Sequence, residues 1–227
     1  MKTTKGNEVI RLIGGRSNVY LIRHITAGKI IVDTGVRISR NQLMRALEEH
    51  GAMRVSYLIL THSHFDHVAN AAYLREKTQA DVLIQKEEAG FLRRGSMRIP
   101  LGTYALTRAL VKLANAVHIK MGAEPCFVDM EFDESLVLPK FTGIELIHTP
   151  GHSPGSSSII VDNEIALVGD TMVNATLFRV FPPFADDTDV LKQSWNRLLD
   201  TGCTTFLPSH GKAITRQEIL DYMQKKA

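Results

Sequence analysis

The stretch Thr61-His62-Ser63-His64-Phe65-Asp66-His67 places three imidazoles and one carboxylate within six residues. Imidazole nitrogen and carboxylate oxygen are ligands that suit zinc and similar divalent ions. The stretch directly follows the apolar run at residues 57–60, which is typical of a strand buried on both faces. In an extended loop the first two histidines point the same way, while Asp66 and the third histidine can face a second position. The stretch therefore predicts a loop that serves two metal positions, about 3.5–4 Å apart as in two-metal hydrolases.

Three further candidate ligands lie at other predicted strand ends, each with Gly or Pro close by. They are found in Pro150-Gly151-His152, in Gly169-Asp170-Thr171 and in Ser209-His210-Gly211. Glycine allows a close backbone approach and proline fixes a turn. Each residue alone is compatible with a structural role, but together with the first stretch they form a complete ligand set. The predicted metal ligands are His62, His64, Asp66, His67, His152, Asp170 and His210.

The remaining pattern predicts an α/β protein. Residues 19–22 and 29–32 form a predicted hairpin around the turn at 26–28, and a strand at 81–85 follows the ligand-rich stretch. Helices are expected at 40–50, 66–77, 187–199 and 215–226. Further strands are expected at 145–148, 157–161, 165–168 and 205–207, with Asp162-Asn163 as a hairpin turn. The length of 227 residues fits a single domain spanning 1–227.

The middle of the chain, residues 86–130, is predicted to be a helical insertion over the site, broken at Gly95, Pro100 and Gly102. Residues 86–120 include seven basic residues and two glutamates, so this segment has a net charge of +5. Because the whole chain has a net charge of +3, the remainder has a net charge of −2. The charge indicates either a solvated helical face or a cationic rim that attracts an anionic substrate. The basic residues are Lys86, Arg93, Arg94, Arg98, Arg108, Lys112 and Lys120. The pocket is also expected to be lined by the loop at 176–184, through Leu177, Phe178, Phe181 and Phe184.

Composition restricts the class of protein. The hydrophobic fraction of 44% and charged fraction of 22% are those of a globular protein. No apolar run approaches the roughly 20 residues that span a bilayer, and the first residues do not resemble a signal peptide. Cys126 and Cys203 do not make a disulfide framework and are expected to be buried apolar residues. We therefore expect a cytoplasmic protein with a small-molecule substrate, without a nucleic-acid partner, and leave its oligomeric state open.

The order of these motifs resembles the metallo-β-lactamase fold superfamily, in the glyoxalase II-like branch of single-domain hydrolases. The resemblance extends from Asn18 to Gly211 and includes Val32-Asp33-Thr34-Gly35 upstream of the ligand-rich stretch. It implies a four-layer αβ/βα sandwich with two metal ions at the edge of two facing sheets. The implied assignment puts His62, His64 and His152 on one ion, Asp66, His67 and His210 on the other, and Asp170 between them.

This sequence differs from several subfamilies at positions that bear on the expected substrate. His64 stands where the oxygen-reducing diiron relatives have Glu, and Asp170 stands where the most familiar zinc β-lactamases have Cys, so antibiotic hydrolysis is not expected. Glyoxalase II proper has a helical C-terminal domain that helps to hold glutathione, whereas about 16 residues follow Gly211 here. A glutathione thioester is therefore not the expected substrate.

The expected function is hydrolysis of an ester, thioester or lactone by a hydroxide that bridges two metal ions. Zinc is the expected metal, with iron or manganese compatible with the same ligands. Asp66 is expected to orient the hydroxide as well as to bind metal, and Asp33 is a candidate hydrogen-bond partner of a ligand histidine. Two alternatives stay open: a mononuclear iron oxidoreductase similar to persulfide dioxygenases, which would have the same seven residues, and a metal-binding regulator without catalysis.

Overall fold

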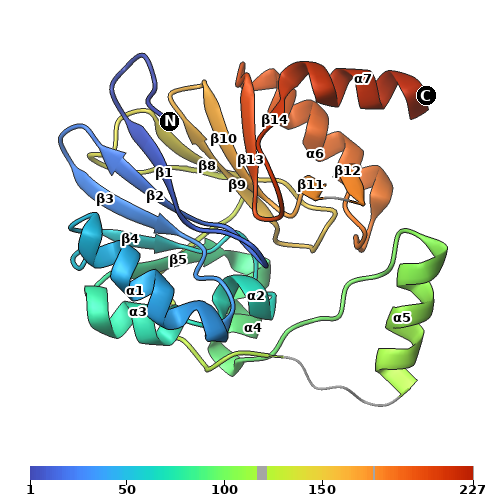
Figure 1. Cartoon of the computed structure of the whole chain (residues 1–227), viewed down its shortest axis with the longest axis horizontal. Helices are drawn as coiled ribbons and strands as arrows, with labels where there is room; N and C mark the ends of the chain where they lie inside the picture. Colours follow the sequence, from blue (N-terminus) through green and yellow to red (C-terminus); the bar gives the residue numbers. More distant parts are fainter. Residues whose placement is uncertain (117–121, 176, 227) are drawn as a thin grey trace.

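The computed structural model describes residues 1–116, 122–175 and 177–226. Two six-stranded sheets face each other, and helices cover the outer face of each (Figure 1). The layers therefore run helix, sheet, sheet, helix, which confirms the predicted αβ/βα sandwich. Apolar side chains fill all three spaces between the layers.

The first sheet has the strand order β1-β2-β3-β4-β5-β6. Strands β1 to β3 are antiparallel and β3 to β6 are parallel. The predicted hairpin of β2 and β3 is confirmed, whereas β1 and β6 were not predicted. The bounds are β1 (Glu8–Ile13), β2 (Val19–His24), β3 (Gly28–Val32), β4 (Tyr57–Ile59), β5 (Asp81–Gln85) and β6 (Met130–Phe132).

The second sheet has the order β14-β13-β10-β9-β8-β7, and a small hairpin of β11 and β12 lies beside it. Asp162 and Asn163 have φ of 57° and 59° in the turn between β9 and β10, which confirms the predicted hairpin turn. The bounds are β7 (Ser135–Val137), β8 (Ile144–His148), β9 (Ser157–Val161), β10 (Ile165–Gly169), β11 (Val173–Ala175), β12 (Phe178–Val180), β13 (Thr205–Pro208) and β14 (Ile214–Thr215).

Helices close the sandwich on both sides. On the first sheet lie η1 (Arg37–Ser39), α1 (Arg40–Glu49), α3 (Ala71–Thr78) and α4 (Lys86–Arg94). On the second lie α6 (Thr188–Asp200) and α7 (Arg216–Lys226), as the apolar periodicity of both segments predicts. The Asp187 carboxylate begins α6 by accepting hydrogen bonds from the backbone N–H groups of Asp189 and Val190.

The predicted helix at 66–77 is wrong in one respect, because it is divided into α2 (Phe65–Val68) and α3. The break lies at Asn70, whose side-chain amide donates to the backbone carbonyls of Thr34 and Val36 at 2.9 and 3.1 Å. The same side chain accepts from the guanidinium of Arg40 at 2.9 Å. Asn70 thereby connects the start of α3 to the segment that follows β3. The short helix α2, which precedes Asn70, contains the candidate ligands Asp66 and His67.

The predicted insertion at 86–130 begins too early. Ala89 and Leu92 of α4 are buried in the apolar layer under the first sheet, so α4 belongs to the sandwich itself. The chain leaves the layers only after Gly95, and α5 (Ala105–Ala116) lies to one side of both sheets (Figure 1). Lys120 and Met121 of the predicted insertion lie outside the described residues. Within the described ranges, no helix is long and apolar enough to cross a membrane.

Candidate metal centre

All seven predicted ligands gather at the edge where the two sheets meet. His62 and His64 follow β4, while Asp66 and His67 lie in α2. The other three follow β8, β10 and β13 of the second sheet. The carboxyl ends of strands from both sheets thus supply one site, as open α/β sheets commonly do.

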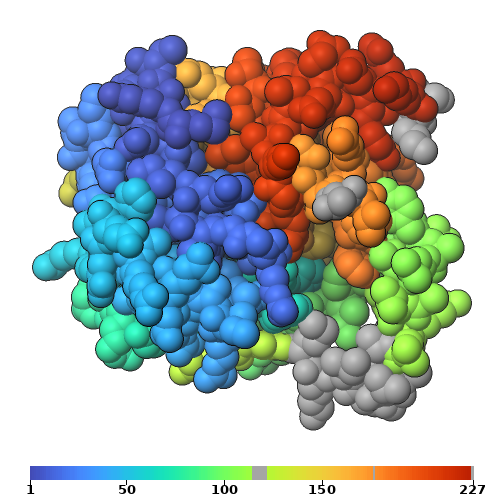
Figure 2. Space-filling view, viewed as in Figure 1, coloured from blue at the N-terminus to red at the C-terminus, as the bar shows by residue number. Residues whose placement is uncertain are grey.

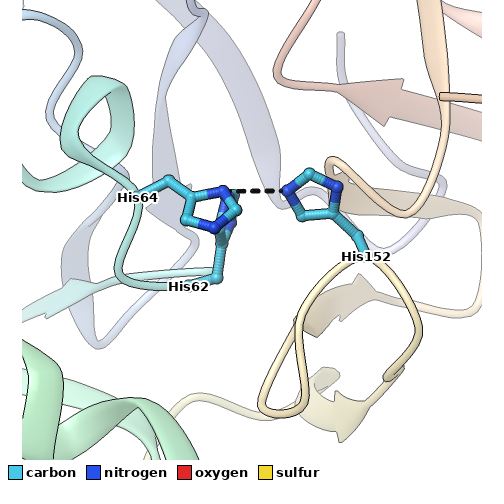
Figure 3. A group of neighbouring side chains, drawn as sticks. All are labelled: His62, His64 and His152. Atoms are coloured by element: carbon cyan, nitrogen blue, oxygen red, sulfur yellow. Dashed lines mark hydrogen bonds between the residues drawn. The ribbon is translucent and has the colours of Figure 1, made fainter. Parts of the chain in front are cut away.

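His62, His64 and His152 form the first group (Figure 3). The Nε2 atoms of His62 and His152 each lie 3.0 Å from Nδ1 of His64, and all three side chains are buried. Two nitrogens on one tetrahedral zinc ion, each about 2.0–2.1 Å from the metal, would be about 3.3 Å apart. The spacing of these nitrogens therefore fits ligands of a single ion.

Asp66, His67 and His210 form the second group. An Asp66 carboxylate oxygen lies 3.2 Å from Nε2 of His210 and 3.7 Å from Nε2 of His67. The Asp170 carboxylate lies between the groups, at 3.6 Å from His152 Nε2 on one side and 3.6 and 3.3 Å from His67 and His210 Nε2 on the other. A third group, His62, His67 and Asp170, overlaps the other two. The division of these ligands between two ions stays a prediction that the resemblance implies.

Two atoms of this cluster are buried without a hydrogen-bond partner among the described residues: Nε2 of His67 and an Oδ atom of Asp170. Leaving a buried polar atom unpaired costs about 1–3 kcal/mol, so such atoms usually have an explanation. A divalent cation between them would satisfy both. The residues present therefore fit the metal ions that the sequence predicts.

The pKa values of His64 and His67 shift in opposite directions. Burial, followed by the neighbouring imidazole of His152, lowers the pKa of His64 to about 3, so its ring offers a lone pair. Burial would also lower the pKa of His67, but the carboxylates of Asp66, Asp170 and Asp33 raise it well above its usual value. Those carboxylates thus create a strongly negative field at the second group, which suits a divalent cation.

Asp33 is the predicted hydrogen-bond partner of a ligand histidine, and the structure bears this out. Its buried carboxylate lies 2.9 Å from Nδ1 of His67 and accepts from the Thr61 backbone N–H at 2.9 Å and from the Ser209 hydroxyl at 3.0 Å. With Nδ1 donating to Asp33, Nε2 of His67 is left as the metal-facing atom. The two hydroxyl-bearing partners were not predicted.

We expect Asp33→Asn to weaken binding of the second metal ion by about 10–100-fold, as the loss of a ligand's hydrogen-bond partner typically does. Asparagine keeps the shape of the side chain and tolerates the positive φ of 60° at this position. The change removes the charge and replaces one acceptor oxygen with an amide donor. Competition with a metal chelator measures the affinity. Asp81→Asn, at an exposed strand start, is the control; equal affinities in the two variants would contradict the role of Asp33.

Glu88 of α4 is a positioning residue that the sequence analysis missed. Its buried carboxylate accepts from the backbone N–H and hydroxyl of Ser63, between two ligand histidines, with 3.0 Å to the N–H. It also accepts from the Ser153 hydroxyl at 2.7 Å and the Gly155 N–H at 3.1 Å, in the loop of His152. One carboxylate therefore holds together the two loops that supply the first group.

Phe184 fixes the orientation of His152. Nδ1 of His152 lies 2.9 Å from the Phe184 carbonyl oxygen, which can only accept, so Nδ1 donates and Nε2 faces the site. Gly151, with φ of 124°, is required here because a Cβ atom would collide with the backbone of Leu191.

A cavity of about 470 Å³ opens on the metal-ligand cluster. Phe178 and Phe184 line it, as predicted, but two other predictions for the 176–184 loop are wrong. Leu177 is 85% exposed, and Phe181 packs against Trp195 and Tyr222 because these rings offer it an apolar surface away from the cavity. Thr176 lies outside the described residues.

The fold and the donor set define a metal-site protein with two facing sheets. The family model of the metallo-beta-lactamase superfamily matches residues 12–210, and the chain belongs to this superfamily. A probable metallo-hydrolase of Methanocaldococcus jannaschii, MJ0888, is 31% identical over 70% of this chain and 68% of its own length. The hydroxyacylglutathione hydrolase GloC of Haemophilus influenzae is 24% identical over 85% of this chain and 84% of its own.

Solved structures show the same fold. The crystal structure of TTHA1623 in a di-iron-bound form has a TM-score of 0.64 and 24% identity, covering 92% of this chain and 94% of that one. This likeness confirms the predicted fold class, and the family model confirms the superfamily. The relatives' names indicate a metallo-hydrolase, and this chain has a candidate His/Asp metal site.

Proposed function

We propose that this protein is a dinuclear metal-dependent hydrolase that cleaves an ester, thioester or lactone bond. The observation that carries the proposal is the set of candidate ligand groups around Asp170, which includes two buried atoms that a cation would satisfy. The hydroxyacylglutathione hydrolase among the relatives supports carbonyl hydrolysis as the reaction class.

Bound metal ions would supply a water made nucleophilic at neutral pH and a positive charge beside the developing oxyanion. His62, His64 and His152 would hold one ion, and Asp66, His67 and His210 the other. The Asp66 and His210 side chains are 20% and 25% exposed and line the cavity, so they meet the substrate side of the cluster. Asp66 would orient the attacking water and pass its proton to the leaving group, since a carboxylate at this position reaches both.

The natural metal is zinc in this proposal, because neutral histidine nitrogen with carboxylate oxygen is a donor set that zinc accepts readily. Iron and manganese suit the same donors, and the structural neighbour TTHA1623 was solved with two irons bound. The substrate is a small molecule, since a cavity of about 470 Å³ falls within the range of small-molecule sites.

The test combines metal analysis with an activity panel. Purified protein is stripped with a chelator and titrated separately with Zn²⁺, Fe²⁺ and Mn²⁺, and the bound equivalents are counted. Each form is then assayed with esters, thioesters and lactones. We expect two equivalents per chain and a gain in hydrolysis as the second binds, because the two groups supply different ligands.

Two outcomes would contradict the proposal. One equivalent of iron, with oxygen uptake in the presence of a persulfide, would instead support the oxidoreductase alternative. Two bound ions with no hydrolysis across the panel would favour a metal-binding regulator.

A further inference from the structure

The cavity beside the metal-ligand cluster is almost entirely apolar. Apart from five of the candidate ligands, its lining consists of aliphatic, aromatic and proline side chains. Among the described residues, polar side chains line this cavity only where the cluster lies. The residues used in the following argument are Met97, Leu110, Val111, Phe178, Pro182 and Phe184.

The two walls of this cavity are joined by backbone hydrogen bonds. One wall comes from residues 97–111 and the other from residues 173–184. Thr103 donates from its N–H to the Pro183 carbonyl at 3.0 Å and from its hydroxyl to the Pro182 carbonyl at 2.7 Å. Tyr104 of the first wall packs against Phe178 of the second, with ring centroids 5.3 Å apart. In the space-filling view the α5 region, in light green, lies against the orange segment that contains β12 (Figure 2). These contacts hold the two walls of the cavity together.

The residues that line the cavity do not favour an anionic group there. Among the described residues, no Lys or Arg lines the cavity. Of the basic side chains predicted to form a cationic rim, Arg93 pairs with Glu131, and Arg98 pairs with Asp186, two residues after Phe184. The described residues of the middle segment that line the cavity are apolar.

The apolar wall is also connected to the cluster. Phe184 contributes its side chain to the cavity and its carbonyl to Nδ1 of His152. A chain lying along this wall would therefore have its carbonyl end beside His152, Asp66 and His210.

We propose that this cavity binds the acyl group of the substrate and that the acyl group is an uncharged, medium-length apolar chain. This inference rests on the proposed hydrolase function. In the reaction the bond between the acyl carbon and the leaving oxygen or sulfur breaks. The water oxygen bonds to the acyl carbon and its proton goes to the leaving group, giving a free carboxylic acid and an alcohol or thiol.

The test is a series of esters with one leaving group and acetyl, butyryl, hexanoyl and octanoyl chains. Burying one methylene is worth about 0.8 kcal/mol, or about 4-fold in kcat/KM. We expect a rise on the order of 100-fold between acetyl and hexanoyl. The second measurement is calorimetric binding of acetate and octanoate to the metal-loaded protein, with octanoate expected to bind more tightly.

Variants on opposite faces of α5 test whether the dependence on acyl-chain length comes from the cavity. Val111 is buried and lines the cavity, whereas Leu106 is 70% exposed on the outer face. Val111→Glu should reduce octanoyl hydrolysis and octanoate binding far more than acetyl hydrolysis, and Leu106→Glu should change neither. Val111→Phe, which fills the cavity without adding charge, should shorten the preferred chain.

The outcomes separate this proposal from the function on which it rests. Normal acetyl hydrolysis with no dependence on chain length would overturn the acyl cavity and leave the hydrolase in place. No hydrolysis of any ester, thioester or lactone, together with tight octanoate binding that Val111→Glu removes, would overturn the hydrolase and keep the cavity. Equal binding of acetate and octanoate would overturn the cavity in either case.

Discussion

Asp66→Ala is expected to abolish hydrolysis while leaving the fold intact. The substitution removes a carboxylate ligand of the second group and the group that orients the attacking water. Loss of a positioned acid or base alone typically lowers the rate by about 10²–10⁴-fold, and loss of a metal ion adds to this. The side chain is partly exposed at the cavity, so its truncation leaves no gap in the apolar layers.

The measurement is kcat and metal content for the same preparation, with thermal unfolding as the control for folding. Ser17 donates its hydroxyl to the Asp66 backbone carbonyl at 2.6 Å, a contact that the variant keeps, so α2 should stay in place. Near wild-type turnover at full metal content would remove Asp66 from the mechanism.

The candidate ligands were recognisable because they lie in the segments that follow predicted strands. An apolar run marks each strand, and Gly or Pro marks the turns at 150–155, 169–171 and 208–211. His62, His152 and His210 could be picked out as candidates in this way without knowing how the strands pair. The break at Asn70 could not, because it depends on contacts of one side chain with the backbone of Thr34 and Val36, which only tertiary structure brings near.

Glu88 shows where sequence reasoning reaches its limit. In the sequence it is one of two adjacent glutamates in a basic segment, and nothing in the local pattern marks it as a partner of the ligand loops. In the structure Glu88 is 2% exposed and faces two ligand loops, whereas Glu87 is exposed. The helical periodicity of α4 indicates which face is buried, but not that a carboxylate on that face holds metal ligands.

The sequence also could not show which phenylalanines line the cavity. Phe178 and Phe181 are three residues apart and equally apolar, so the sequence does not separate them. Phe178 lies in β12 and lines the cavity, whereas Phe181 follows the strand and packs against Trp195. The charge of the middle segment left two interpretations open for a related reason. Net charge describes a segment, whereas a substrate meets only the face that folding turns toward the cavity.

We expect Glu88→Ala to have the second large effect, on both stability and metal binding. Its carboxylate accepts four hydrogen bonds from two loops, and the backbone N–H groups of Ser63 and Gly155 would lose their buried partner. Each unsatisfied buried group costs about 1–3 kcal/mol. We therefore expect a loss of about 3 kcal/mol in the free energy of unfolding, which corresponds to roughly 6–12 °C in Tm for a chain of this size.

Metal binding distinguishes a positioning role from a merely structural one. Because Ser63 lies between His62 and His64, its release should weaken the first metal group more than the second, so a chelator should remove one equivalent early. Glu88→Gln, which keeps an acceptor oxygen, should restore part of the affinity, and Glu87→Ala on the same helix should bind both equivalents normally. If Glu88→Ala lost stability but released both metals at the wild-type chelator concentration, the carboxylate would support the fold without positioning the ligands.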